Sequence, residues 1–165
     1  MSSNKTSVLF VCLGNICRSP SAEAVFTKMA QNQNLDLVID SAGTAGYHTG
    51  AEPDKRSQAV GLERGYSFKG LKCRKVTPED FDKFDYILGM DNKNISNLLE
   101  ICPKGHEDKV GLFLSFADLQ EKEVPDPYYG GKKGFEYVLD LIEEGSKGLI
   151  RQLQDNQLDC YNTNE

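Results

Sequence analysis

Short hydrophobic runs alternate along this chain with longer segments in which hydrophobic residues recur every three or four positions. The first run, residues 8–11, is continuous and rich in β-branched side chains, which is typical of a strand buried on both faces. Shorter runs at 38–39, 86–88 and 110–113 have the same character. The pattern therefore predicts four strands, the second of which is closed by Ser41-Ala42-Gly43.

The segments around these runs have the spacing of amphipathic helices. Predicted helices cover residues 19–31, 54–64, 92–101 and 132–155, and a short one opens at 77–80. We expect Ser19 to cap the first helix, with Pro20 at its first position, and Asn92 to cap the helix that follows it. Gly145 and Gly148 are expected to weaken the middle of the last helix.

Repeated strand–helix alternation favours an α/β fold, in three layers and doubly wound, with a four-stranded parallel sheet and helices on both faces. Because we find no internal repeat or linker, we expect a single domain over residues 1–165, with its core at about 7–155 and a frayed tail after Leu158. Ligands of such sheets bind beyond the carboxyl ends of the strands. That rule directs attention to the loops at 12–19, 41–50 and 118–131.

Composition narrows the choice of function. The 165 residues are 39% hydrophobic and carry a formal net charge of −6, without a basic stripe, so nucleic acid is not an expected partner. The N-terminal apolar run, residues 8–13, is too short for a membrane span or a signal peptide, and no membrane partner is expected. Five unevenly spaced cysteines suit the cytoplasm, which is reducing. Two distant histidines and the lack of a Cys-x-x-Cys pair argue against a metal, and no cofactor is expected.

The strongest chemical signal is the loop between the first strand and the first helix, which reads Cys12-Leu13-Gly14-Asn15-Ile16-Cys17-Arg18-Ser19. Successive backbone N–H groups of such a loop can turn inward and, with the helix N-terminus, bind an anion. Arg18 can donate two hydrogen bonds to phosphate oxygens, and the same field favours a nucleophilic thiolate at Cys12. In the alternative interpretation, Cys12 is a small apolar residue in a tight turn. That alternative leaves a cation at the positive end of a helix unexplained.

A second signal is the segment Val-Pro-Asp-Pro-Tyr-Tyr-Gly-Gly at residues 124–131. The two prolines stiffen the backbone around Asp126. A partly desolvated acid on a stiff loop suits a general acid, and Tyr128 and Tyr129 can form the walls of a slot for a flat ring. The alternative is an ordinary proline-rich surface turn.

Five motifs together resemble those of a known family. They are Val-Cys-x-Gly-Asn-x-Cys-Arg-Ser-Pro at residues 11–20, Asp-Ser-Ala-Gly at 40–43, Phe-Asp-Tyr-Ile at 84–87, Met-Asp at 90–91 and Asp-Pro-Tyr-Tyr-Gly at 126–130. The chain resembles the low-molecular-weight protein tyrosine phosphatases over about residues 7–155. The resemblance implies a flavodoxin-like strand order and metal-independent hydrolysis of phosphotyrosine through a phospho-cysteine. The implied partners are phosphotyrosine-containing proteins and, in the active site, inorganic phosphate or other oxyanions.

The resemblance also implies roles for individual residues. Cys12 is the expected nucleophile, Arg18 the phosphate-binding cation, and Asp126 the acid and then the base. Ser41 is expected to support the loop. The expected substrate- and phosphate-binding residues are Leu13, Gly14, Asn15, Ile16, Cys17, Ser19, Tyr47, Tyr128 and Tyr129. We further expect peroxide to convert Cys12 to a sulfenic acid that Cys17 captures as a reversible disulfide, the alternative being a passive buried thiol.

One position departs from the family pattern. Many members carry a histidine two residues before the position of Cys73, where it hydrogen-bonds the loop asparagine, and here Leu71 stands in its place. We therefore expect Asn15 to be held differently or less rigidly than in those members.

Three other functions stay open. Arsenate reductases coupled to thioredoxin share a similar loop but need two more thiols near residues 80–90, and Cys73 and Cys102 are wrongly placed for that. Protein-arginine phosphatases commonly carry threonine after the loop asparagine, and Ile16 there favours phosphotyrosine. An inactive phosphotyrosine-binding module is disfavoured because the nucleophile, the arginine and the acid are all present.

Overall fold

One parallel sheet forms the centre of the protein. The computed structural model describes residues 5–127 and 131–163, with side chains described as far as residue 156. The strands are β1 (Ser7–Cys12), β2 (Val38–Gly43), β3 (Tyr86–Gly89) and β4 (Val110–Leu112). Their order is β2-β1-β3-β4 and all pairs are parallel, which confirms the predicted sheet.

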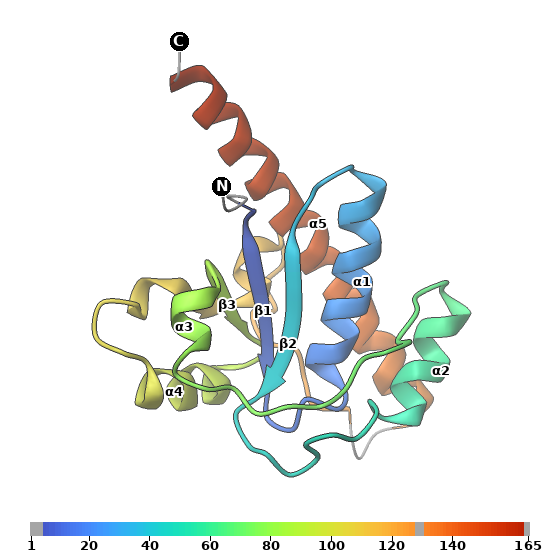
Figure 1. The fold of residues 1–165 in the computed structure, drawn as a ribbon. Helices are drawn as coiled ribbons and strands as arrows, with labels where there is room; N and C mark the ends of the chain where they lie inside the picture. The colour runs from blue at the N-terminus through green and yellow to red at the C-terminus, as the bar shows by residue number, and fades with distance from the viewer. Residues whose placement is uncertain (1–4, 128–130, 164–165) are drawn as a thin grey trace.

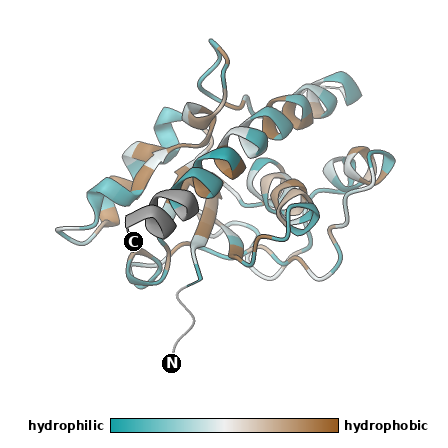
Figure 2. Cartoon of the chain, turned by 90° about the horizontal axis from the view of Figure 1, so that it is seen from above, coloured by the Kyte–Doolittle hydropathy of each residue, from teal (hydrophilic) through white to brown (hydrophobic). Residues whose placement is uncertain are grey.

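Helices cover both faces of this sheet, which confirms the three-layer arrangement (Figure 1). One face carries α1 (Arg18–Asn32), α2 (Lys55–Glu63), α5 (Lys132–Thr163) and the 3-10 helix η2 (Phe113–Phe116). The other face carries α3 (Asp80–Lys83), α4 (Asn92–Ile101) and the 3-10 helix η1 (Glu107–Lys109). The helices in Figure 2 carry both hydrophobic and hydrophilic residues, as expected of helices that bury one stripe.

The alternation of side chains along β1 divides the core into two clusters. Phe10 belongs to the larger cluster under α1 and α5, where its ring meets the rings of Phe26 and Phe113 edge to face. Leu9 and Val11 belong to the smaller cluster on the α3 and α4 side. Since β1 is buried over its whole length and lies inside the sheet, the loop that follows it starts from a rigid base.

Two helix starts differ from the prediction. Helix α1 begins at Arg18 with Cys17 as its N-cap, so Ser19 is not the cap and Pro20 stands in the third position. The Ser19 hydroxyl instead lies against the sulfur of Cys12, as described below. Helix α4 is capped by Asp91 and not, as predicted, by Asn92. Asp91 and Asn94 form a capping box, in which the side chain of each accepts a hydrogen bond from the backbone N–H of the other.

The last helix is longer and firmer than predicted. It runs unbroken to Thr163, whereas the spacing predicts a helix that ends at about residue 155. A Cβ atom at Gly148 would lie 1.8 Å from the carbonyl oxygen of Phe116, and one at Gly145 would lie 2.8 Å from the ring of Phe113. These glycines therefore allow α5 to pack closely on η2. None of the helices in the described part of the chain has the length and hydrophobicity that crossing a membrane requires.

Candidate active site

A pocket of about 220 Å³ opens at the carboxyl ends of the strands, the edge at which Figure 1 shows the loops after β1 and β2. Its lining comes from three separate segments of the chain. The lining residues are Cys12, Leu13, Gly14, Ile16, Cys17, Arg18, Tyr47, His48 and Asp126. Most residues that the sequence singled out therefore meet in one place.

The loop after β1 presents unused donors to this pocket. The backbone N–H groups from Leu13 to Cys17 donate no hydrogen bond to any residue that the structure describes. They lead into the N-terminus of α1, whose first-turn N–H groups give that end a partial positive charge. The arrangement is suited to an anion with several oxygens.

The sulfur of Cys12 lies against two polar groups of Ser19. It lies 3.0 Å from the hydroxyl oxygen of Ser19, and the Ser19 backbone N–H points at it from 3.5 Å. Both side chains are buried, with Cys12 3% exposed and Ser19 fully covered. Ser19 therefore contacts the sulfur through both its hydroxyl and its backbone N–H.

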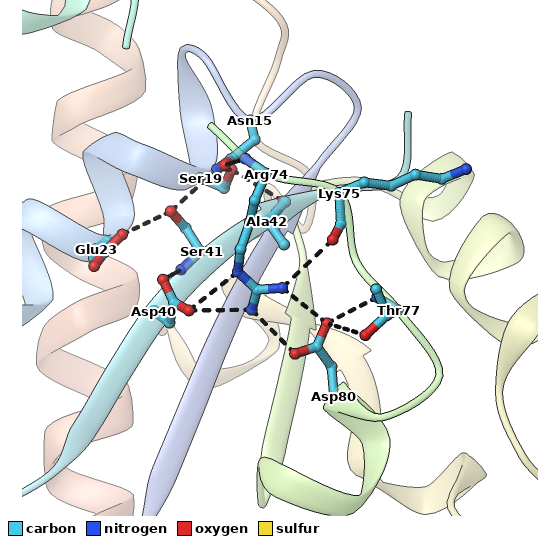
Figure 3. A network of polar contacts seen from close by, with 10 residues as sticks. All are labelled: Asn15, Ser19, Glu23, Asp40, Ser41, Ala42, Arg74, Lys75, Thr77 and Asp80. Carbon is cyan, nitrogen blue, oxygen red and sulfur yellow. Dashed lines mark hydrogen bonds and ion pairs between the residues drawn. The ribbon is translucent and has the colours of Figure 1, made fainter. Parts of the chain in front are cut away.

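Asn15 holds the shape of the loop. Its φ of 58° lies in the left-handed region, which is costly for most residues but tolerated by asparagine. Its side-chain amide donates to Ser19 Oγ at 2.8 Å and to Ser41 Oγ at 3.0 Å, and its oxygen accepts from the backbone N–H of Arg74 at 2.9 Å (Figure 3). The thiol of Cys73 also donates to the Asn15 carbonyl oxygen, at 2.9 Å. Leu71 has no side-chain hydrogen bond to offer Asn15, and the backbone N–H of Arg74 makes the contact to the Asn15 amide oxygen.

Gly43, the last residue of β2, allows the neighbouring loop to pass close by. A Cβ atom there would lie 2.8 Å from the carbonyl oxygen of Leu13 and 3.0 Å from the carbonyl carbon of Gly14. Gly14 in turn lies against His48, whose ring carbon would be 3.3 Å from a Cβ atom at that position. The Asp-Ser-Ala-Gly motif therefore supplies both a support for Asn15 and room for the loop.

Arg18 is buried and is oriented by two acceptors from distant segments. Its Nη1 donates to Asp91 Oδ2 at 2.6 Å and to the carbonyl oxygen of Val124 at 3.0 Å. Its Nε and Nη2 donate to no described residue. Burial opposes its charge, but Cys12 and Asp91 outweigh that effect and raise the pKa of the guanidinium. The sequence predicts an anion beside Arg18, and the carboxylate of Asp91, which caps α4, supplies part of that negative charge.

Asp126 stands at the mouth of the pocket on a segment tied to the sheet. The Val124 backbone N–H donates to the carbonyl oxygen of Met90 at 2.8 Å, just beyond β3. Asp126 is exposed in the described part of the structure, whereas the sequence predicts a partly desolvated acid. Tyr128 and Tyr129 lie outside the described residues. Tyr47 reaches the pocket from the loop after β2, with 76% of its surface exposed.

Cys17 lines the same pocket but has a different environment from Cys12. It is buried, and burial raises the pKa of its thiol to about 12, against a smaller opposing effect of a hydrogen bond with Ser57. Cys17 is therefore a neutral thiol at physiological pH.

A larger cavity of about 630 Å³ adjoins the pocket and shares Ile16 and His48 with it. Among the residues whose side chains are described, no group of three or more histidine, cysteine, aspartate or glutamate side chains is arranged to hold a metal ion.

Sequence reasoning from the residues missed three contributors to this site. Asp91 was noticed only as part of a motif, while Arg74 and Glu23 were not considered at all. Asp91 bonds Arg18, Arg74 bonds Asn15, and Glu23 bonds Ser41, and none of the three has a local pattern that would reveal its contact. The best available signal was the resemblance itself, which included the Met-Asp pair at residues 90–91.

Comparison with known proteins gives a consistent result. A family model described as low molecular weight phosphotyrosine protein phosphatase matches residues 7–158. A putative low molecular weight protein-tyrosine-phosphatase of Synechocystis is 45% identical over 150 residues, which cover 88% of this chain and 95% of that protein. The human low molecular weight phosphotyrosine protein phosphatase is 44% identical over 140 residues, covering 80% of this chain and 85% of its own.

Solved structures agree in fold. A crystal structure of a protein tyrosine phosphatase from Entamoeba histolytica, with Hepes in the active site, matches with a TM-score of 0.89 and 46% identity, covering 93% of this chain and 99% of that one. Wzb of Vibrio vulnificus, in complex with benzylphosphonate, matches with a TM-score of 0.80 and 28% identity, covering 90% of this chain and 99% of its own.

Proposed function

The chain belongs to the low molecular weight phosphotyrosine protein phosphatase family, and from that premise we propose that it hydrolyses phosphotyrosine in proteins through a phospho-cysteine at Cys12. The observation that carries this proposal is the convergence of Cys12, the loop N–H groups, Arg18 and Asp126 on one pocket. The benzylphosphonate bound by the Vibrio vulnificus relative joins an aromatic ring to a phosphonate through one methylene group, which resembles the phosphotyrosine that the pocket needs to accept.

Binding is the first step. The phosphate dianion accepts hydrogen bonds from the N–H groups of the loop and from the Nε–Nη2 edge of Arg18, since Nη1 is held by Asp91 and Val124. A guanidinium edge matches two phosphate oxygens in one plane. The phosphotyrosine ring then lies toward the mouth of the pocket, beside Tyr47.

Chemistry follows in two displacements. The Cys12 thiolate attacks phosphorus, forming the S–P bond as the P–O bond to tyrosine breaks, and Asp126 donates a proton to the departing phenolate. A water molecule then gives its proton to Asp126 and attacks phosphorus, and the S–P bond breaks to release phosphate and the thiolate. The loop N–H groups and Arg18 stabilise the charge on the equatorial oxygens in both transition states, and these donors need no metal.

Initial rates on three matched phosphopeptides test this function. Wild-type protein is expected to hydrolyse the phosphotyrosine peptide and to leave phosphoserine and phosphoarginine peptides almost untouched. Cys12→Ser should have no measurable turnover, while Cys102→Ser, which changes a cysteine away from the pocket, should equal wild type. Turnover by Cys12→Ser, or a preference for phosphoarginine, would contradict the proposal.

We also propose that Cys17 protects the nucleophile from oxidation. Peroxide oxidises the Cys12 thiolate to a sulfenic acid, and the Cys17 thiol then forms a disulfide with it and releases water. Support comes from the pocket that the two cysteines share. Mass spectrometry after mild peroxide treatment should find the 12–17 disulfide in wild type, and its absence would overturn this role.

The compartment proposed for this reaction is the cytoplasm. The four cysteines whose side chains are described are all free, which supports a reducing environment. A single phosphatase domain over residues 1–165 stays a prediction.

A further inference from the structure

The support of Asn15 leads away from the pocket to a second titratable group. Because the Arg74 backbone N–H needs an acceptor, Asn15 turns its oxygen to that side, and both amide hydrogens face Ser19 and Ser41. The Ser41 hydroxyl accepts one of these hydrogens, and it donates its own to Glu23 Oε1 at 2.7 Å. The direction of each bond is thus set by its neighbour.

A continuous relay results, part of which Figure 3 displays. It runs from the Glu23 carboxylate to Ser41 (2.7 Å), Asn15 (3.0 Å), Ser19 (2.8 Å) and the Cys12 sulfur (3.0 Å). The three polar side chains in the middle are all at least 96% covered: Ser41 is 4% exposed, Asn15 1% and Ser19 0%. Buried bonds of this kind depend strongly on one another, because water does not replace a lost partner.

Glu23 itself lies at the far end of the relay, in an open groove between α1, β2 and residues 65–71. Among the described residues, Ser41 is its only hydrogen-bond partner, and Leu71 beside it in the groove offers none. The charged groups facing it are Asp40 and Arg74, and Lys28 and Lys69 line the same groove. Arg74 is shared with Asp40 and Asp80, so it neutralises Glu23 only in part.

The balance of these effects makes the group responsive at neutral pH. Burial raises the pKa of Glu23 to about 7, and Asp40 acts in the same direction, while the bond from Ser41 and the charge of Arg74 oppose the rise. Its carboxyl therefore changes charge near neutral pH.

We propose that Glu23 is a positioning residue for the phosphate-binding loop, whose negative charge tightens the Ser41–Asn15–Ser19 relay and whose protonation loosens it. An ionised carboxylate accepts the Ser41 hydrogen in a charge-assisted bond, which is roughly twice as strong as its neutral counterpart. Ser41 then becomes a better acceptor for Asn15, and the left-handed turn is held more firmly. The role rests on the proposed function, because it acts on the loop that binds the substrate phosphate.

The test compares oxyanion binding in wild type and Glu23→Gln across neutral pH. The probe is tungstate, a dianion over this range, titrated into the protein by calorimetry at about pH 6 and about pH 8, on either side of the pKa of about 7. Glutamine keeps an acceptor for Ser41 but has no charge. We expect the dissociation constant of the variant, divided by that of wild type, to be about 1 at the lower pH, where both side chains are neutral. At the higher pH the ratio should be about 5, because the substitution replaces a charge-assisted bond with a neutral one.

Two further variants identify the relay as the cause. In the Ser41→Ala background the relay is already cut, so adding Glu23→Gln should leave the tungstate affinity unchanged at both pH values. Glu143→Gln is the matched control, since this carboxylate is also half-buried but bonds Tyr66 and Arg64 on the α2 and α5 side, and its ratio should not change with pH.

Three outcomes would overturn the role. They are a ratio for Glu23→Gln that is flat with pH, one that still moves in the Ser41→Ala background, or an equal effect of Glu143→Gln. Turnover measured in parallel with p-nitrophenyl phosphate should follow the same ratio. If no phosphomonoester is hydrolysed, the proposed function fails, while the tungstate series still reports on the relay.

Discussion

Two of the loops that line the pocket, those after β1 and β2, are built in opposite ways. In the loop after β1 and at the start of α1, Asn15 and Arg18 are buried and hydrogen-bonded to segments more than 20 residues away in sequence. In the loop after β2, residues 46–52 are exposed, and Tyr47 is the most exposed of the large hydrophobic residues described. That loop is anchored mainly by backbone bonds at its two ends, from Ala45 to Leu13 and from Gly50 to Cys73.

The difference separates two tasks. A phosphate group is the same in every substrate, so the groups that bind it profit from a rigid network in which each donor and acceptor is fixed. The protein around the phosphotyrosine varies, and an exposed rim can meet it without disturbing the network. Changes in the loop after β1 should therefore act on kcat, and changes in the rim on KM.

The largest effect should come from the acid at the mouth of the pocket. Asp126→Asn removes the proton for the leaving phenolate, and kcat on phenyl phosphate should fall by roughly 10²–10⁴-fold. The loss should be smaller on p-nitrophenyl phosphate, whose leaving group needs less protonation. Equal losses in kcat/KM, which reports only the first displacement, would show that Asp126 is not the acid.

Asn15→Ala tests the rigidity of the buried loop. It removes three hydrogen bonds from a residue with a left-handed backbone, and a strain of 1–3 kcal/mol at such a site predicts a loss of roughly 10–100-fold in kcat. Asn34→Ala is the matched control, since Asn34 has a φ of 55° in the turn after α1 and lies away from the pocket. Comparable losses in both variants would indicate a general effect on folding.

Glu23→Gln should show that the buried network costs stability. The folded-state pKa of about 7 lies above the ordinary value of 4.5, so the folded protein disfavours the ionised group. Wild type should accordingly lose stability as pH rises from about 4.5 to about 7, and the variant should not. Above pH 7 we expect the variant to be more stable by about 1–2 kcal/mol, with no difference below pH 4, as measured by urea unfolding. A variant less stable than wild type at pH 8 would contradict the direction of the pKa shift.

The smallest effect should be found at the rim. Tyr47→Ala removes a ring that can stack on the substrate, so KM for a phosphotyrosine peptide should rise about 2- to 10-fold with kcat nearly unchanged. Tyr137→Ala, at another partly exposed tyrosine, is the control and should leave both constants as they are. A fall in kcat without a change in KM would mean that the rim takes part in the chemistry.

The sequence was most informative where a pattern is local. The strands were predicted from continuous apolar runs, and the Cys12 loop from its position between a strand and a helix. The start of α1 was misjudged because Ser19 and Pro20 resemble a cap, whereas the tertiary contact with Cys12 decides the role of the serine.

The supports of the loop were beyond the reach of sequence patterns for the same reason. Asp91 lies 73 residues from Arg18, and Arg74 lies 59 residues from Asn15. Glu23 is one polar residue among several on α1, and only the packing of that helix against β2 brings it to Ser41. The pKa of its carboxyl depends on that burial, which no spacing of residues reveals.

The most direct test of the account is to capture the covalent intermediate. In the Asp126→Asn variant the second displacement lacks its base, so phosphoenzyme should accumulate during turnover of p-nitrophenyl phosphate. Rapid quenching followed by peptide mass spectrometry should then find one phosphoryl group on the peptide that contains Cys12, and none in the Cys12→Ser protein. A phosphoryl group on another residue, or steady turnover with an unmodified Cys12 throughout, would contradict the account.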